Sequence, residues 1–484
     1  MGIESINTSL DNEVEEPPMS KSDTSLPVQP SKKQIARAVL ASTVGTTVEW
    51  YDFILFGTAS ALVFNVLFFP DFDPLVGTVA AFGANAVGFL IRPLGGFVFG
   101  ALGDRFGRRS ILIFTLVMMG LATACMGLLP TYEDIGILAP LLLVFLRLVQ
   151  GLGAGAEFAG AVIMVAEFAP PKHRTLLTSL PGWGNAVGLV LGTGIFSLLS
   201  AVLTEDQLLS WGWRIPFLLG VIGIAVGLWV RLGVMESPDF IAMRKSGEAK
   251  KRQPLKDVFS KHPKNFLTSM AAVVAENGTS YLVKTFIITY IASFLFLDKS
   301  IGLNAILVAS LISLASTPVF GYLGDRFGVK RVYGTATIFI FVFAFPFFWL
   351  IGTGTTVLIY VAIIIMYNFG IRALGANQGA LLSGLFPTKV RYSGVASSRE
   401  LAAALSGGLS PVIGTALLAW TGHYWPVAVY IMILCLITFA ATRYGSKSLE
   451  GDEFNDRDEV EGFESESTDE HEPTTPIENP RSTI

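Results

Sequence analysis

Long hydrophobic runs without charged residues recur along the whole chain. Residues 111–129 and 332–352 contain no Asp, Glu, Lys or Arg, and each has close to the length of about 20 residues with which a helix crosses the hydrocarbon core of a bilayer. A transmembrane β-barrel would instead show segments of about ten residues in which polar and apolar side chains alternate. The runs do not alternate in this way. We therefore predict an all-α membrane protein.

The positions of these runs predict twelve transmembrane helices. Their expected ranges are 38–65, 77–101, 111–129, 137–168, 176–202, 214–235, 266–295, 303–323, 332–352, 357–386, 394–420 and 427–444. Residues 1–37 are polar and rich in Pro, Ser and Glu, so we expect a disordered N-terminal tail and no cleavable signal peptide. The first span itself is then expected to serve as the insertion signal.

One motif occurs twice. The sequence GALGDRFGRR stands at 100–109, after the second predicted span, and GYLGDRFGVKR stands at 321–331, after the eighth. Six predicted spans separate the two copies, which indicates two parallel six-helix repeats. We expect an N-terminal half over 38–235, a central loop over 236–265 and a C-terminal half over 266–444.

Charged residues distribute unevenly between the two sets of loops. One set, which includes the central loop, is rich in Lys and Arg, whereas the opposite set carries Asp71, Asp73, Glu133, Asp134, Glu205, Asp206 and Asp298. By the positive-inside rule, both termini and the central loop are expected to be cytoplasmic. Residues 445–484 contain thirteen Asp or Glu against three Lys or Arg, and we expect a disordered acidic cytoplasmic tail.

Composition narrows the function classes. The chain has 484 residues, of which 52% are hydrophobic and 15% charged, which is far too apolar for a soluble globular protein. The two cysteines lie within apolar runs and the four histidines are scattered, so we expect no metal site and no cofactor. No Walker motif is present, which argues against direct use of ATP. We expect neither an enzyme nor a nucleic-acid partner.

Several further motifs make the chain recognisable. They are EWYDF at 49–53, IRPLGG at 91–96, RxxQG at 147–151, SWGWRIPF at 210–217, ESP at 236–238 and FPTxVRYSG at 386–394. With the doubled loop, they resemble the metabolite:proton symporters of the major facilitator superfamily over about residues 35–445. That subfamily includes carriers of shikimate, 2-oxoglutarate, citrate and proline or betaine, and the shikimate-type branch is the most similar. One departure is GAEFA at 155–159, where the family more often has Gly-Gly-Glu-(aromatic)-Gly.

The resemblance implies that the repeated loops gate the cytoplasmic side without touching solute. We expect their glycines to allow a tight turn, their aspartates to meet a neighbouring helix end, and their arginines to stay at the lipid surface. The gating residues are then Gly100, Asp104, Arg105, Gly107, Arg108, Gly321, Asp325, Arg326 and Gly328.

Ionisable residues inside the predicted spans are the candidates for chemistry, because each costs at least about 2.5–3.5 kcal/mol to insert without a partner. Glu49 and Asp52 lie three residues apart, on one face of the first span, and with Glu157 they are our candidates for proton coupling. Cations that pair with these acids or hold an anionic solute are Arg92, Arg147 and Lys284. Aromatic side chains that could stack on solute are Tyr51 and Trp183. Further charges in spans are Glu167, expected near the cytoplasmic interface, and Glu276, Arg372, Arg399 and Glu400.

These features favour a secondary transporter in a bacterial cytoplasmic membrane, with the bilayer, protons and a small solute as its partners. The surplus of in-membrane cations favours uptake of a small organic acid, either shikimate-like or a 2-oxo or dicarboxylic acid. A zwitterionic osmolyte such as proline or betaine is the alternative solute. The alternative of another class is a transport-inactive sensor that signals through the acidic tail. A channel is disfavoured because no filter or ring of like residues is present.

Overall fold

The computed structural model describes residues 30–70, 80, 83–84, 86–237, 240–241 and 254–444. The expected acidic tail over 445–484, most of the N-terminal tail and part of the central loop lie outside these ranges. All regular secondary structure in the described part of the chain is helical. The predicted all-α fold is therefore confirmed.

Ten of the described helical segments are long and apolar enough to span a membrane. They are Ala86–Phe106, Arg108–Gly127, Leu138–Phe168, Pro171–Val202, Arg214–Leu232, Lys299–Phe327, Val329–Gly352, Thr356–Ser383, Arg391–Thr421 and Trp425–Tyr444. Two further helical segments, 32–67 and 263–294, match the first and seventh predicted spans. The twelve-helix prediction is confirmed, although the first helix already begins at Lys32, where the Ser31 side chain caps it.

The described part of the first half is built from six long helices, α1, α4, α5, α7, α9 and α11, with short helical segments between them. The first span consists of α1 (Lys32–Ala59), η1 (Ser60–Phe64) and α2 (Asn65–Leu67). The remaining elements are α4 (Arg92–Phe106), α5 (Arg108–Gly127), α6 (Tyr132–Ile135), α7 (Leu138–Phe168), α8 (Arg174–Ser179), α9 (Trp183–Val202), α10 (Glu205–Gln207) and α11 (Arg214–Leu232).

The second half follows the short amphipathic helix α13 (Pro254–Lys261) of the central loop. Its seventh span combines α14 (Pro263–Tyr281), η6 (Leu282–Phe286), α15 (Ile287–Thr289) and η7 (Tyr290–Phe294). The other elements are α16 (Lys299–Phe327), α17 (Val329–Gly352), α18 (Thr356–Ile365), η8 (Met366–Ile371), α19 (Arg372–Ser383), α20 (Arg391–Ala402), η9 (Ala403–Gly408), α21 (Ser410–Thr421) and α22 (Trp425–Tyr444).

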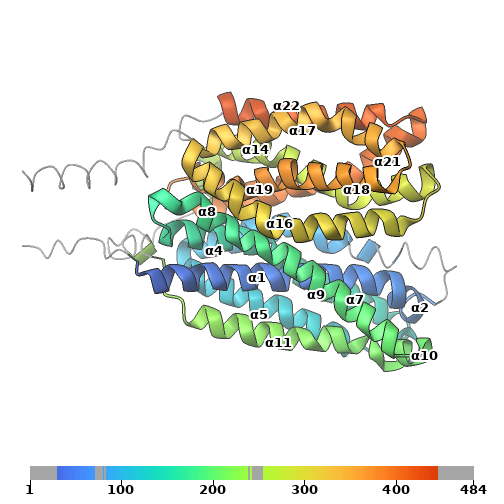
Figure 1. The fold of residues 1–484 in the computed structure, drawn as a ribbon. Helices are drawn as coiled ribbons and strands as arrows, with labels where there is room; N and C mark the ends of the chain where they lie inside the picture. Colours follow the sequence, from blue (N-terminus) through green and yellow to red (C-terminus); the bar gives the residue numbers. More distant parts are fainter. Residues whose placement is uncertain are drawn as a thin grey trace, which may run out of the picture.

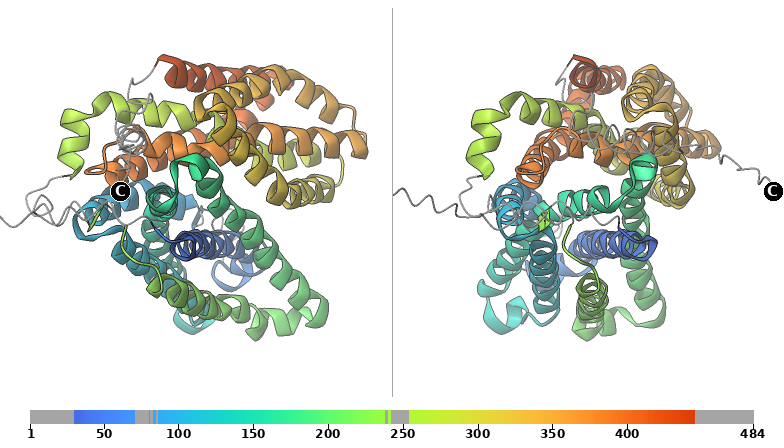
Figure 2. Two further views of the ribbon diagram at one scale, coloured as in Figure 1. Left: turned by 60° about the vertical axis from the view of Figure 1, so that its left-hand side comes forward. Right: turned by 90° about the vertical axis from the view of Figure 1, so that its left-hand side faces the viewer.

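The two halves form two helix bundles that lie against each other (Figure 2). Within the first bundle α1 packs on α9 and α5 packs on α7 and α11, and within the second α17 and α14 pack on α22. The main contacts between the bundles join α4 and α7 to α20, and α8 to α16 and α19. These contacts lie toward the end of the molecule where α1 begins, and the bundles diverge toward the end that carries α2 and α10 (Figure 1).

The outer surface of both bundles is apolar, as a bilayer requires. Large hydrophobic side chains such as Trp229, Val342 and Trp420 are more than half exposed. The interior contains an unusual number of polar side chains, among them Glu49, Asp52, Glu157 and Glu276, all of which are buried. Since a charge in hydrocarbon needs a partner or a cavity, the positions of these groups locate the candidate site.

Candidate functional site

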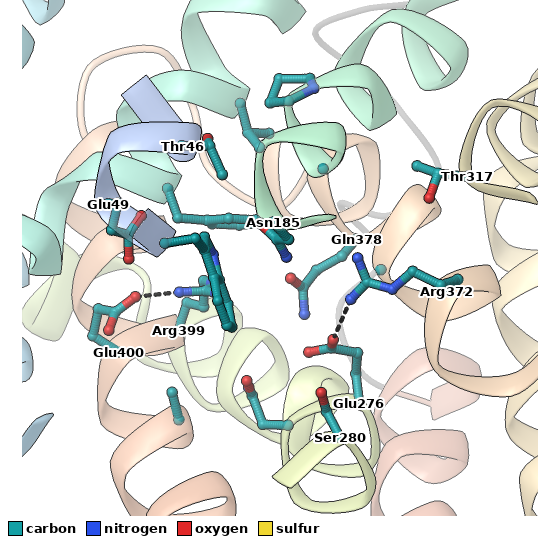
Figure 3. A pocket seen from close by; sticks show the side chains of 18 of the residues that line it. Thr46, Glu49, Asn185, Glu276, Ser280, Thr317, Arg372, Gln378, Arg399 and Glu400 are labelled. Atoms are coloured by element: carbon teal, nitrogen blue, oxygen red, sulfur yellow. Dashed lines mark hydrogen bonds and ion pairs between the residues drawn. The ribbon is translucent and has the colours of Figure 1, made fainter. Parts of the chain in front are cut away.

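A cavity lies between the two bundles and encloses about 870 Å³, counted out to its opening. Helices of both halves line it, with α1, α4, α7 and the α8–α9 segment on one side and α14, α16, α19 and α20 on the other. The side chains of Asn185 from α9 and Gln378 from α19 project toward its middle (Figure 3). Further polar groups on the wall are Thr46, Thr178, Asn277, Ser280 and Thr317.

Three arginines of this cavity are each paired with a glutamate. Arg92 lies 2.9 Å from Glu49, and both side chains belong to the first half. In the second half, Arg372 lies 3.6 Å from Glu276, and Arg399 is hydrogen-bonded to Glu400. The last two pairs face the cavity in Figure 3. Within each pair the arginine and the glutamate neutralise each other, so the three pairs leave little net charge for a ligand.

Lys284 differs from the three arginines. It lines the cavity from η6, and among the described residues no carboxylate forms an ion pair with it. Its ammonium group instead lies 4.6 Å from the centre of the Trp50 ring and 5.7 Å from that of Tyr367. Aromatic faces attract a cation but do not neutralise its charge. The π-helical turn that carries Lys284 is of a kind often found at functional sites. Lys284 is therefore placed to receive an anion.

A second, smaller cavity lies inside the first half, among α1, α4, α5 and α7. Asp52 and Arg147 line it, and Glu49 and Arg92 line both this cavity and the central one. The pair Glu49–Arg92 therefore forms a partition between the two. Glu49 and Asp52 face the same side of α1, as their spacing predicts.

The surroundings of Asp52 are polar but loosely connected. Arg147 is hydrogen-bonded to Gln150, which donates to Thr123 at 2.7 Å. The side chains of Gln150 and Thr123 lie near Asp52. Neither carboxylate oxygen of Asp52, however, has a hydrogen bond within normal limits among the described residues. A Cβ atom at position 88 would lie 2.7 Å from Nε of Arg147, so Gly88 leaves the room that this arginine occupies. Asp52 is thus a buried carboxyl group near Thr123, Gln150 and Arg147 that forms no ion pair with any described residue.

Five of the residues proposed for proton coupling or solute binding lie off the central cavity. Asp52 and Arg147 belong only to the smaller one. Glu157 on α7 is paired with Arg231 on α11, and the hydroxyl of Tyr51 donates to the carbonyl of Pro216 at 2.6 Å. The indole of Trp183 donates to the carbonyl of Leu314 on α16 at 2.8 Å. The structure therefore brings together Glu49, Arg92 and Lys284 around the central cavity, but not these five.

Apart from Lys284, sequence reasoning did not single out the second-half charges of the cavity. Glu276, Arg372, Arg399 and Glu400 were visible as ionisable residues inside predicted spans, which was the available signal. Arg231, the partner of Glu157, also lies in a predicted span and was not weighed. Nothing in one sequence shows which of these side chains face the same cavity.

The repeated loops lie together at one end of the bundle, which we call the loop end. The carboxylate of Asp104 accepts hydrogen bonds from the backbone N–H groups of Tyr392 at 3.2 Å and Ser393 at 2.8 Å, at the start of α20. The carboxylate of Asp325 accepts from Thr175 at 2.7 Å and Leu176 at 2.9 Å, at the start of α8. Each aspartate therefore caps a helix of the opposite half, which confirms the expected contact with a helix end.

The glycines of these loops have the expected effect. Gly107 and Gly328 adopt φ values of 107° and 91°, which other residues rarely reach, and each joins two antiparallel helices. Gly100 faces the backbone of Ser393 in α20, and Gly321 faces Leu176 in α8. A side chain at either position would push the two halves apart.

The expectation that the loop arginines stay at the lipid surface is wrong for Arg108. Arg105 and Arg326 are exposed, but Arg108 is completely buried and lies 2.9 Å from Glu167. Glu167 also bonds Arg391 of the second half at 3.2 Å, so it is a buried interhelical partner and not an interfacial residue. A buried guanidinium needs an acid, and this acid comes from α7, 59 positions further along the chain from Arg108.

Comparison with known proteins agrees with this architecture. A family model described as Major Facilitator Superfamily matches residues 53–396. The chain is 40% identical to a shikimate transporter of Escherichia coli (strain K12) over 410 residues, which are 84% of this chain and 94% of that protein. It is 34% identical to the glycine betaine/proline/ectoine/pipecolic acid transporter OusA of Dickeya dadantii (strain 3937), over 84% of this chain and 82% of that protein.

Solved structures show the same fold. The proton:xylose symporter XylE bound to 6-bromo-6-deoxy-D-glucose matches with a TM-score of 0.69 at 18% identity, over 85% of this chain and 94% of that one. At this identity the match concerns the fold alone.

Proposed function

The chain belongs to the major facilitator superfamily of membrane transporters, and we propose that it takes up a small organic acid together with protons by alternating access. The observation that carries the proposal is Lys284, a cavity cation without an acidic partner among the described residues. An anionic solute group that displaces water from Lys284 gains a charge-assisted hydrogen bond. The solute we favour is shikimate-like, with a 2-oxo or dicarboxylic acid as the next choice.

The charge balance of the cavity supports a monoanion. Four cations line it, Arg92, Lys284, Arg372 and Arg399, against the three glutamates Glu49, Glu276 and Glu400. One carboxylate therefore neutralises the site, whereas a dicarboxylate adds a charge that needs a further cation. The amide and hydroxyl groups of Asn185, Asn277, Ser280 and Gln378 suit the hydroxyl groups of a polyhydroxylated acid.

Asp52 is the proposed proton carrier. Its carboxyl group is buried and has no hydrogen bond within normal limits among the described residues, so it offers a buried site for a proton. The Glu49–Arg92 partition separates Asp52 from the solute cavity, and we propose that it transmits solute binding to the proton site. A solute that draws Arg92 away from Glu49 changes the charge next to Asp52. The static contacts of Glu157 with Arg231 make Glu157 a weaker candidate.

We propose that the loop end faces the cytoplasm of a bacterial cell. The basic loops lie there, and acidic residues lie at the opposite end. Hydrogen bonds from the backbone N–H groups of Thr131 and Ser300 lower the pKa of Asp134 and Asp298, respectively, so both carboxylates stay ionised at that end. This asymmetry follows the positive-inside rule. With the halves in contact at the loop end, the described conformation is closed toward the proposed cytoplasmic side.

A zwitterionic osmolyte is the second candidate solute. Glu276 and Glu400 line the cavity together with Lys284, so the site offers acids for an ammonium group as well as a cation for a carboxylate. The likeness to a betaine and proline carrier points the same way. This solute differs from an organic acid in that it needs both signs of charge.

The test is uptake of shikimate into proteoliposomes that hold the purified protein, with an imposed inward proton gradient. We expect Lys284→Gln to weaken apparent affinity by roughly 10–150-fold, the value of one charge-assisted hydrogen bond. The methyl ester of shikimate, without the charge, should bind both proteins equally weakly. Lys264→Gln, which removes an exposed lysine at the loop end, is the matched control and should bind like the wild type.

Two outcomes decide the proposal. If Lys284→Gln binds the acid as tightly as the wild type does, the carboxylate is held elsewhere and the acid proposal fails. If the wild type transports neither shikimate nor its ester but accumulates betaine, the zwitterionic osmolyte becomes the favoured solute. Separately, Asp52→Asn should abolish gradient-driven accumulation and retain solute exchange, because exchange does not require proton release. Full accumulation by Asp52→Asn would contradict its role.

A further inference from the structure

An apolar groove runs along the outer face of the second half, between α16, α17 and η8. It encloses about 780 Å³, counted out to its opening. The residues that line it are Phe320, Leu323, Phe327, Arg331, Val332, Thr335, Ala336, Phe339 and Phe369. This groove shares no lining residue with the solute cavity and takes no part in the proposed transport chemistry.

Aromatic rings form its walls. The ring of Phe369 lies 6.1 Å from that of Phe320 and 6.3 Å from that of Phe339, so the three rings form one connected surface. Phe369 is 56% exposed and Phe327 is 51% exposed. Because Phe327 and Phe369 are exposed on the outer face, a flexible chain can reach these rings from the bilayer.

The mouth of the groove at the loop end is basic. Arg331 lines the groove, and the guanidinium of Arg326 lies 5.4 Å from the centre of the Phe327 ring. Both arginines are exposed, and neither forms an ion pair with an acid among the described residues. In the first-half loop Arg105 is likewise exposed and its guanidinium lies 5.3 Å from the centre of the Phe106 ring, but the next two arginines are engaged: Arg108 is paired with Glu167, and Arg109 donates to backbone carbonyls of α11.

The dimensions of the groove match one lipid leaflet. Phe320 precedes Phe327 by seven residues and Phe339 follows Arg331 by eight, which at 1.5 Å per residue is about 10–12 Å of depth. One leaflet contributes about 15 Å to the hydrocarbon core. A chain that starts at the arginines therefore stays in contact with the aromatic wall over most of its leaflet.

We propose that this groove binds one anionic phospholipid from the leaflet at the loop end. Its phosphate lies between Arg326 and Arg331, and one acyl chain follows Phe320, Phe339 and Phe369. Apolar contact alone does not select a lipid, because all acyl chains are equally apolar. The two arginines, which have no acidic partner within the described ranges, select for negative charge. The proposal requires only that the protein spans a membrane, and is independent of the solute.

The test uses the full-length protein in neutral detergent, with native mass spectrometry to count retained lipids. Phosphatidylglycerol and phosphatidylcholine with identical chains are the probes. We expect the wild type to retain phosphatidylglycerol preferentially, and each of Arg326→Gln and Arg331→Gln to lower that preference about fivefold. Lys172→Gln removes an exposed cation at the same end outside the groove and should leave the preference unchanged.

Thr335→Trp separates the groove from simple surface charge. Thr335 is exposed in the groove, so a Trp side chain there fills the acyl-chain path while both arginines remain. We expect this variant to lose phosphatidylglycerol although its melting temperature is unchanged. Retention of the lipid by Thr335→Trp, or equal binding of both lipids by the wild type, would overturn the proposal. An effect of Lys172→Gln as large as that of Arg331→Gln would do the same.

Discussion

Asp104 in the first half and Asp325 in the second each accept hydrogen bonds from two successive backbone N–H groups at the start of a helix in the opposite half. The two contacts are equivalent by position. Tyr392 follows Arg391 directly, as Thr175 follows Arg174, and both arginines end a loop between consecutive spans. The same motif therefore forms the same cap twice, with the halves exchanged.

The surroundings of the two caps differ. Asp104 is completely buried, and Arg108, Glu167 and Arg391 form a charge network beside it. In the second half, Val329 stands at the position of Arg108 and Gly384 at that of Glu167, counted from the loop glycines and from the loop arginines. Asp325 is partly exposed, and its cap has no equivalent network of these groups.

This difference shows that a motif determines a local contact, whereas its neighbours determine how strongly the contact holds. Charge-assisted hydrogen bonds in a buried network lose more when one member is removed, because the others stay buried without a partner. We therefore expect the Asp104 side to hold the loop end closed more strongly than the Asp325 side. Four variants, the last of them a double substitution, test this ranking.

The largest effect is expected for Glu167→Gln. It leaves Arg108 and Arg391 buried without their shared carboxylate, which costs about 3–5 kcal/mol. The loop end should open, and transport should fall at least tenfold. Spin labels at Lys172 and Lys389, exposed in opposite halves, report the opening as a longer distance. An unchanged distance distribution would show that the network does not hold the halves together.

Asp104→Asn should have the next largest effect. The amide keeps one acceptor for the start of α20 but loses the charge that Ser393 and Tyr392 face, at a cost of about 1.5–3 kcal/mol. The same spin-label pair should show partial opening, and the melting temperature should fall by several degrees. A loss smaller than that of the next variant would reverse the ranking.

Asp325→Asn is the matched substitution in the second half. It removes the same kind of cap, but solvent reaches Asp325 and screens part of its charge. We therefore expect the closed loop end to lose about 0.5–1.5 kcal/mol of stability. Transport should fall only severalfold. Comparison of the two Asn variants under identical conditions measures the contribution of the surrounding network directly.

The smallest effect is expected from building the missing network. Val329→Arg combined with Gly384→Glu places an arginine and a glutamate at the positions of Arg108 and Glu167. A Cβ atom at position 384 would make only ordinary van der Waals contacts, so the backbone there accepts a side chain. We expect a gain below about 1 kcal/mol for the closed loop end, because the pair is partly exposed. Transport should slow modestly, and the spin-label distance should narrow. Faster transport would contradict this account.

The fold was largely predictable because its signals are local. The length of each apolar run determines whether a helix spans the membrane, and the repeated loop reveals the two halves. The shared face of Glu49 and Asp52 follows from helical periodicity alone. Local errors concern helix ends, as at Lys32, where the capping contact of Ser31 extends the helix beyond its apolar part.

The candidate site was only partly predictable. The sequence shows that charges inside spans need partners, but the partners found in the structure are far away along the chain. Glu157 meets Arg231, Arg108 meets Glu167, and Arg391 of the second half completes that cluster. Which arginine pairs with which glutamate depends on how whole helices pack against each other.

The sequence by itself determined the twelve spans, the repeat, and the contact of each loop aspartate with a helix end, because these follow from periodicity, length and the chemistry of short segments. Only the tertiary structure decided that Lys284 has no acidic partner among the described residues, that Arg147 and Trp183 lie off the cavity wall, and that Arg108 is buried. The physical reason is that a side chain's partners are set by the packing of helices, which brings together residues that no local pattern connects.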